Sequence, residues 1–325
     1  MTTTQTFEYA PGVVDEDDPL HGELMKLNMG PQHPATHGVL RLVVTLDGET
    51  MKQIEPVVGY LHRGKEKTCE TLGWRKFFVH TDRLDYVQPL MNNIGYAIAL
   101  EKLAGLKVPE RGQDIRVLLM ELSRIAAHLI YLGTTGIDLG AVTMFFFTFN
   151  EREKLYDVLD AYTGHRMNNT YVRIGGVYAD VDENVQQGIE RFLDEFPAKV
   201  DEFESMLTGN RIWFDRNRNV GVLSREQALA WSLTGPNLRG SGVDHDLRKD
   251  EPYCGYTATT SRSRSARSAT ATTATSSASR RCASRPGSAS RRSRGCRTPA
   301  EASSWRRIAA TSCPPRARCA PRWRS

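Results

Sequence analysis

The sequence lacks the features that mark several common protein classes. Residues 1–256 hold only two cysteines, Cys69 and Cys254, and no CxxC pair, which excludes a disulfide framework and an iron–sulfur or zinc site of the usual spacing. No run approaches the roughly 20 apolar residues that span a bilayer, and the polar, acidic N-terminus is unlike a signal peptide. No GxGxxG, Walker, HExxH or nucleophile-elbow motif occurs. These absences predict a soluble, cytoplasmic body without a nucleotide-binding motif.

Charge divides the chain into two unlike parts. The formal net charge is +5, but residues 257–325 contain 16 Arg, no Lys and one acid, Glu301. That segment therefore carries +15, which leaves −10 for residues 1–256. A mildly acidic body argues against a nucleic-acid-binding domain. The alternative, a disordered Arg/Ser arm that binds RNA or anionic lipid, depends on the basic segment alone.

The basic segment has the composition of a shifted reading frame. Of its 69 residues, 67 are Ala, Arg, Ser, Thr, Pro, Gly, Cys or Trp, against 25 of the 56 residues from 201 to 256. All eight can be encoded with G or C at the second codon position. A GC-rich gene has G or C at most third codon positions. A frame slip that reads these third positions as second positions therefore gives this composition. We interpret residues 257–325 as an out-of-frame, disordered tail, which buries too little apolar surface to fold.

Periodicity and turn residues divide the body into two regions. Strands at 39–46 and 51–58 flank Asp47-Gly48, which is a hairpin signal. A short helix is expected near 65–72, and loops are expected at 133–136 and 234–242. The other expected helices are 86–106, 114–132, 142–162, one capped by Asp182 that Pro197 interrupts before Leu207, and one from Ser224 to Leu233. We predict an α+β fold that is mainly α, with a polar lead-in (1–27), a β-rich region (28–75) and an incomplete helical bundle (76–256).

The stretch NMGPQHPATHG, residues 28–38, is predicted to be a stiff, shaped loop. Each of its two prolines fixes the backbone angle φ, and each of its two glycines allows backbone conformations that other residues avoid. Pro34 stands between His33 and His37, which argues against a pair of histidines within a helix. Histidine titrates near neutral pH, so the loop is suited to proton chemistry or ligand binding. The structural alternative is a turn whose histidines bond to backbone.

Two stretches that contain acidic residues have both a structural and a functional interpretation. The run DRLDY, residues 82–86, precedes a predicted helix that either acid could cap. In the functional interpretation, Tyr86 directs its hydroxyl into a cleft. Asp138 could cap the helix that begins at Val142, or it could orient a histidine. Arg166 and Arg173, with Gly175-Gly176, indicate a tight loop packed on the bundle.

Taken together, these stretches resemble a known family. Between residues 28 and 256 the chain contains, in order, GPQHPATHGVLRLVVTLDGE, GYLHRGKEK, DRLDY, IDLGAVTMFFFTFNEREK, GHRMNNTYVRIGGV and LTGPNLRGSGVDHDLRKDEPY. They resemble the quinone-site D subunit, of the 49-kDa type, of respiratory complex I. The resemblance implies the fold of a nickel–iron hydrogenase large subunit that has lost its metal. The stretch HRGKEKTCE, which would carry the first CxxC, has Cys69 alone.

The resemblance also implies roles for five residues. His37 matches the histidine that contacts one quinone oxygen, Tyr86 matches the tyrosine that contacts the other, and Asp138 matches the acid that hydrogen-bonds the histidine. His33 and Arg63 match neighbours that line the quinone site. No metal is expected in this chain, because the family's electron donor is a 4Fe-4S cluster on the adjacent B subunit. An imidazole and a phenol are suitable proton donors to a reduced quinone.

The expected function follows from the same resemblance. It is that of a subunit of proton-pumping NADH:quinone oxidoreductase, which couples electron transfer from NADH to proton translocation with ubiquinone or menaquinone as substrate. The implied partners are the B and C subunits and the membrane-arm H subunit, with B, C, D, E, F and G forming a peripheral arm on the cytoplasmic side of the cell membrane. The alternatives are a nickel–iron hydrogenase-like large subunit and an inactive truncated fragment.

Overall fold

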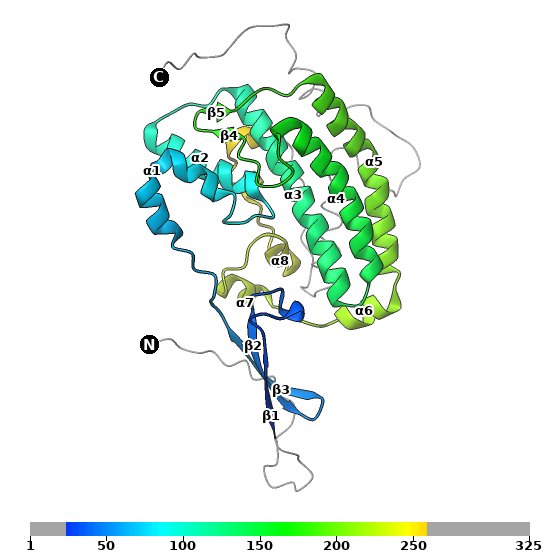
Figure 1. The fold of residues 1–325 in the computed structure, drawn as a ribbon. Coiled ribbons are helices and arrows are strands. Elements are labelled where there is room, and N and C mark those ends of the chain that lie inside the picture. Colours follow the sequence, from blue (N-terminus) through cyan, green and yellow to red (C-terminus); the bar gives the residue numbers. More distant parts are fainter. Residues whose placement is uncertain (1–23, 259–325) are drawn as a thin grey trace. The chain divides into compact units, whose positions relative to one another are not determined.

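The computed structural model describes residues 24–258, which divide into two compact units at Gly73–Trp74 (Figure 1). The sequence placed the boundary two residues later, between residues 75 and 76. Most of the polar lead-in and all but the first two residues of the predicted out-of-frame tail lie outside the described residues.

The N-terminal unit is built on a three-stranded antiparallel sheet of order β1-β2-β3. Its strands are β1 (Met25–Met29), β2 (Arg41–Asp47) and β3 (Thr50–Val57). The predicted hairpin is confirmed, because Asp47 pairs with Thr50 around Gly48, whose φ of 56° suits glycine. The sequence did not predict β1, whose first residues fall within the expected lead-in.

Helix α1 (Lys65–Thr81) crosses the boundary between the units and is broken at Gly73, where φ is 71° and ψ is 166°. The predicted helix ended at Leu72, next to this break. The helix continues because Phe77 and Phe78 are buried on its second half.

Long helices form the core of the second unit. They are α2 (Pro89–Ala104), α3 (Glu110–Asp138), α4 (Val142–Thr163) and α5 (Glu183–Thr208). Figure 1 shows α3, α4 and α5 side by side. Their facing sides supply a buried cluster that includes Leu119, Leu129, Leu155, Phe192 and Phe203. The prediction of a mainly α fold with a small β-rich region is therefore confirmed for the described residues. None of the helices in this part of the chain is long and apolar enough to cross a membrane.

Local capping signals were predicted well. Asp182 caps α5 by accepting a hydrogen bond from the backbone N of Val185 at 2.8 Å. Ser224 and Gln227 form the expected capping box at the start of α7 (Arg225–Ala230). Gly105 and Gly164 end α2 and α4 in the left-handed conformation, with φ of 66° and 76°.

The loop predicted at 133–136 is wrong, because α3 continues through it to Asp138. A Cβ added at Gly133 would lie 2.5 Å from Oγ1 of Thr148, and one at Gly136 would lie 3.1 Å from Cβ of Met144. These glycines therefore allow α3 and α4 to approach closely, which offsets their low helix propensity.

Two other predicted breaks also form helix. Helix α5 runs through Pro197 without restarting, and Phe196 and Val200 are buried on either side of it. The loop predicted at 234–242 contains α8 (Gly235–Gly240), in which Pro236 takes one of the first two helical positions.

The remaining elements are short. They are α6 (Arg211–Asn217), α9 (Leu247–Asp250), the 3-10 turns η1 (Pro34–Thr36) and η2 (Cys254–Ala258), and a two-stranded ribbon of β4 (Val172–Arg173) and β5 (Gly176–Val177). The ribbon is the tight loop expected around Gly175-Gly176. It packs on the bundle through Arg116 of α3, whose Nη2 donates to the carbonyl oxygens of Arg173 and Gly176 at 2.9 and 3.0 Å.

Candidate functional site

The histidine loop, residues 28–38, is held in one shape by its own backbone. The carbonyl oxygen of His33 accepts hydrogen bonds from the backbone N of Thr36 and Gly38 and from the buried hydroxyl of Thr36, at 3.1, 3.4 and 3.0 Å. At Gly30 φ is 87°, and an added Cβ would lie 2.1 Å from the carbonyl oxygen of Leu40. The prediction of a stiff, shaped loop is confirmed, and the loop contains η1.

The two histidines of this loop are exposed. His33 immediately precedes η1, and His37 immediately follows it. The backbone of His37 has a φ of 52°, which a residue with a Cβ rarely adopts. Such backbone strain is often found at functional sites, where the surrounding structure holds it in place. The loop therefore presents two imidazoles from a fixed backbone.

Arg63 lies in the same unit, in the segment between β3 and α1, and it is exposed. Arg41 links this segment to the start of the histidine loop. Arg41, which follows the loop, donates to Oδ1 of Asn28 at its start, at 3.2 and 3.0 Å, and to the hydroxyl of Tyr60 at 3.4 Å. His33, His37 and Arg63 thus belong to connected parts of one unit.

Tyr86 lies in the second unit, on a turn between α1 and α2 that we call the tyrosine turn, residues 82–88. Asp85 supports this turn, because its carboxylate accepts from the backbone N of Val87 and its carbonyl oxygen accepts from Nδ2 of Asn92, both at 3.1 Å. Helix α2 starts only at Pro89, so the helix predicted from Tyr86 begins three residues too early. Tyr86 is 60% exposed, so its phenol is accessible within this unit.

Asp138 is the last residue of α3, and it is exposed. Its interpretation as the N-cap of α4 is wrong, because Ala141 takes that position. The α3–α4 junction is tight, with the backbone N of Ala141 bonded to the carbonyl oxygen of Gly136 at 2.7 Å. Arg216 of α6 also donates to the carbonyl oxygen of Leu139 at 2.7 Å. A carboxylate is therefore presented from a braced helix end.

The five predicted site residues divide between the two units. The structure places His33, His37 and Arg63 in the first unit, and it places Tyr86 and Asp138 on different elements of the second. The expected meeting of imidazole, phenol and carboxylate at one quinone stays a prediction.

No group of three or more His, Cys, Asp or Glu side chains among residues 24–258 is arranged to hold a metal ion. Cys69 lies on α1 and Cys254 on η2, and both are free thiols. Burial raises the pKa of Cys254, and the charge of Arg116 opposes that rise.

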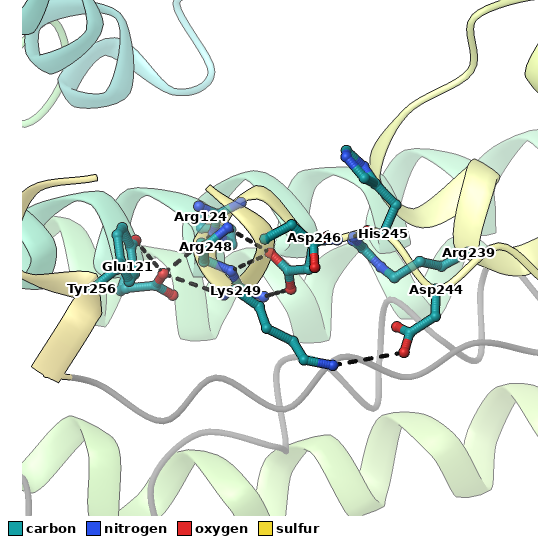
Figure 2. Close-up of polar contacts among 10 residues, drawn as sticks. Glu121, Arg124, Arg239, Asp244, His245, Asp246, Arg248, Lys249 and Tyr256 are labelled. Atoms are coloured by element: carbon teal, nitrogen blue, oxygen red, sulfur yellow. Dashed lines mark hydrogen bonds and ion pairs between the residues drawn. The ribbon is translucent and has the colours of Figure 1, made fainter. Parts of the chain in front are cut away.

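A buried polar network, which the sequence did not reveal, joins α3 to the segment 239–256 (Figure 2). Glu121 of α3 accepts from Tyr256 at 2.5 Å and from Arg248 at 3.3 Å, both at Oε1. Arg248 also donates to both carboxylate oxygens of Asp246, at 3.0 and 2.7 Å. The signal available in the sequence was Glu121, a charged residue between Met120 and Leu122 on a helix otherwise rich in apolar residues.

Electrostatics in this network favour the charged form of Asp246 and the neutral form of Tyr256. Burial alone raises the pKa of Asp246, but the hydrogen bonds and charge of Arg248 outweigh that effect and lower the pKa to about 2. Burial raises the pKa of Tyr256 to about 12. Asp246 therefore stays ionised and Tyr256 stays neutral across the physiological pH range.

Comparison with known proteins identifies the family. The family model described as respiratory-chain NADH dehydrogenase, 49 Kd subunit, matches residues 138–266. The D subunit of NADH-quinone oxidoreductase from Methylacidiphilum infernorum is 51% identical over 235 residues, which cover 72% of this chain and 56% of the relative. The D subunit from Akkermansia muciniphila is 49% identical over 261 residues, 78% of this chain and 63% of the relative. That from Geobacter metallireducens is 49% identical over 234 residues, 72% of this chain and 60% of the relative.

The chain thus spans about three-fifths of the length of these curated relatives. The aligned part exceeds two thirds of this chain, and the identity lies near one half in each case. On these matches the chain belongs to the family of the NADH-quinone oxidoreductase D subunit, the 49-kDa subunit of the respiratory-chain NADH dehydrogenase.

Proposed function

We propose that residues 24–258 contribute the quinone-reduction site of a proton-pumping NADH:quinone oxidoreductase. The observation that carries this proposal is that both expected proton donors are exposed within their own units and held by fixed backbone: His37 on the histidine loop and Tyr86 on the tyrosine turn. The family relationship supports it, because the relatives are subunits of NADH-quinone oxidoreductase by name.

The residues of this chain would supply protons and orientation. Reduction of a quinone to a quinol needs two electrons and two protons. The electrons would come from the 4Fe-4S cluster of the neighbouring B subunit. The phenol of Tyr86 would donate a proton to one quinone oxygen, and the imidazolium of His37 would donate a proton to the other.

The remaining site residues would tune this transfer. Asp138 would stabilise the imidazolium of His37 before transfer and would lose that cationic partner afterwards. This change of charge would start the motion that is coupled to proton translocation. His33 and Arg63 would line the site, where a cationic guanidinium can stabilise negative charge that develops on the quinone oxygens.

The proposed assembly is the one that the family implies. The B and C subunits and the membrane-arm H subunit would contact this chain, and B, C, D, E, F and G would form the peripheral arm. The arm would lie on the cytoplasmic side of the cell membrane, as a peripheral part of the complex.

The proposal is tested in a complex whose full-length D subunit carries residues 24–256 of this chain. His37→Ala and Tyr86→Phe should each lower NADH:quinone reductase activity at least about tenfold, because each removes a positioned proton donor, whose contribution is typically about 100-fold or more. NADH oxidation with ferricyanide, which bypasses the quinone, should stay unchanged. Undiminished quinone turnover in both variants would refute the assignment. The hydrogenase-like alternative requires bound nickel, so nickel analysis of the same preparation distinguishes it from the proposed function, for which nickel should be absent.

A further inference from the structure

Asp82, at the start of the tyrosine turn, is a buried acid for which the proposed chemistry has no use. Its side chain is 0% exposed. Oδ2 accepts from the hydroxyl of Thr170 at 2.6 Å, and Oδ1 accepts from Nδ2 of Asn93. Asn93 lies on α2 and Thr170 follows α4, so one carboxylate joins three separate segments of the unit.

Burying the carboxylate of Asp82 costs free energy, which its hydrogen bonds must offset. The nearest cation is Arg83, whose Nη1 lies 3.8 Å from Oδ2 and whose side chain is 42% exposed. Burial raises the pKa of Asp82, although the hydrogen bonds from Thr170 and Asn93 oppose that rise. Ionised side chains without an equally buried partner cost free energy, and hydrogen bonds must compensate for the lost water. Here those bonds come from Thr170 and Asn93, which belong to the segments that surround the turn.

The position of Asp82 connects this anchor to Tyr86. Asp82 and Tyr86 are four residues apart, and Asp85 fixes the second half of the turn through Val87 and Asn92. The turn begins with a hydrogen bond from the backbone N of Leu84 to the carbonyl oxygen of Thr81 at 3.1 Å. The hydroxyl of Thr81 also accepts from Nδ2 of Asn93 at 2.8 Å. The buried end of the turn is therefore held to α2 at two neighbouring residues.

We propose that Asp82 is a positioning residue for quinone reduction, which fixes the placement of Tyr86 by binding Asn93 and Thr170 beneath the tyrosine turn. The inference rests on the proposed function of Tyr86. Small displacements of a reacting group lower the rate strongly, by as much as about 100-fold for an error on the order of 1 Å. Loss of the anchor should thus reduce kcat for quinone while the complex still assembles.

The test uses the same assembled complex, with rates expressed per mole of complex. Asp82→Asn replaces an acceptor with an amide group that faces the donor Nδ2 of Asn93. It should lower kcat for a short-chain quinone about tenfold and change KM less than about twofold. Thr170→Val removes one hydrogen bond at similar volume, and it should lower kcat about threefold.

Two further variants separate positioning from general damage. The exchange Asp82→Asn with Asn93→Asp restores an amide–carboxylate contact, so it should recover at least half of the lost kcat. Asp182→Asn makes the same chemical change at the N-cap of α5 and should leave kcat unchanged. NADH:ferricyanide activity should be equal in all these variants.

Each outcome decides the inference. If Asp82→Asn and Thr170→Val both keep the parent kcat while Tyr86→Phe lowers it, Asp82 has no positioning role and the proposed function stands. If Tyr86→Phe itself keeps full turnover, the proposed function fails and the inference falls with it. If Asp82→Asn does not assemble, the kcat of Thr170→Val decides the question, and a loss confined to KM or shared with ferricyanide reduction contradicts positioning.

Discussion

The guanidinium of Arg116 and the carboxylate of Glu101 form a two-point ion pair in the interior of the helical unit. The distances are 2.8 Å from Nη1 to Oε2 and 2.5 Å from Nη2 to Oε1. The same two residues hold the ribbon of β4 and β5, because Glu101 accepts from the backbone N of Gly175 at 2.7 Å. One ion pair therefore joins α2, α3 and the ribbon.

We expect Arg116→Met to lower the free energy of unfolding by about 3–5 kcal/mol, since it leaves the carboxylate of Glu101 buried without its cation. Chemical denaturation of the purified chain measures this change. The matched control is Arg111→Met, which breaks the ion pair with Asp180 at the surface. Its effect should stay below about 1 kcal/mol. Equal effects of the two substitutions would show that burial does not set the cost.

Gly133→Ala should destabilise the α3–α4 packing by about 1–3 kcal/mol, because its Cβ would overlap the hydroxyl of the buried Thr148. Gly95→Ala on the exposed side of α2 is the control, since nothing lies within 4 Å of an added Cβ. That change should stabilise the chain by up to about 1 kcal/mol through helix propensity. Thermal unfolding of both variants compares them directly, and a stabilising Gly133→Ala would contradict the close approach.

The histidine loop offers a second pair of glycines. Gly30 has a positive φ, and an alanine there would place its Cβ against the carbonyl oxygen of Leu40. Gly38 has a φ of 95°, but nothing lies within 4 Å of an added Cβ. We expect Gly38→Ala to cost about 1–3 kcal/mol from backbone strain alone and Gly30→Ala to cost more. Amide hydrogen exchange in residues 28–40 measures the loosening. Faster exchange in Gly38→Ala than in Gly30→Ala would contradict this order.

Asp246 gives a pH dependence with a definite sign. Its pKa of about 2 in the folded chain lies below the ordinary value of 3.8. Ionised Asp246 therefore stabilises the fold above about pH 4, and this contribution is lost as the pH falls toward 2. The stability difference between the parent and Asp246→Asn should be largest above pH 4 and shrink on acidification.

Urea denaturation at several pH values measures that difference. Asp244→Asn is the control, because its ion pair with Lys249 is half exposed and 3.8 Å long. Its effect should be small and should change little with pH. A difference for Asp246→Asn that grows below pH 4 would contradict the assignment.

The composition of residues 257–325 predicts a frame slip near codon 256. Resequencing the locus should reveal a gained or lost base there, after which the restored frame should continue to resemble the D subunit of the relatives. An unbroken frame, confirmed by mass spectrometry of a peptide from residues 257–325, would disprove the slip. The family match, which ends at residue 266, stops close to the same place.

Local chemistry in the sequence predicted the parts of the fold that depend on a few neighbouring residues. The N-cap at Asp182, the capping box at Ser224 and the turn at Gly48 each involve contacts within a few positions. The errors arose where distant packing decides. Gly133 looks like a loop residue until Thr148 of α4 is placed beside it, and Pro197 looks like a helix end until its buried neighbours are seen.

The candidate site was predictable only in part, for the same reason. The stiffness of the histidine loop follows from its own glycines and prolines, whereas the hydrogen bond that holds Asp82, at the start of the tyrosine turn, comes from Thr170, 88 positions away. No periodicity relates such residues. The positions of His33, His37, Tyr86, Asp138 and Arg63 came from resemblance to a family, which records long-range contacts that one sequence does not.

The buried contact of Tyr256 limits where the reading frame can shift without loss of packing. This side chain is 3% exposed and donates to Glu121 in the middle of the longest helix among the described residues. A base gained or lost before its codon would leave Glu121 without this donor and would loosen η2, the turn that ends the described part of the chain. A frame shift therefore preserves the hydrogen bond between Tyr256 and Glu121 only if it occurs after the codon for Tyr256.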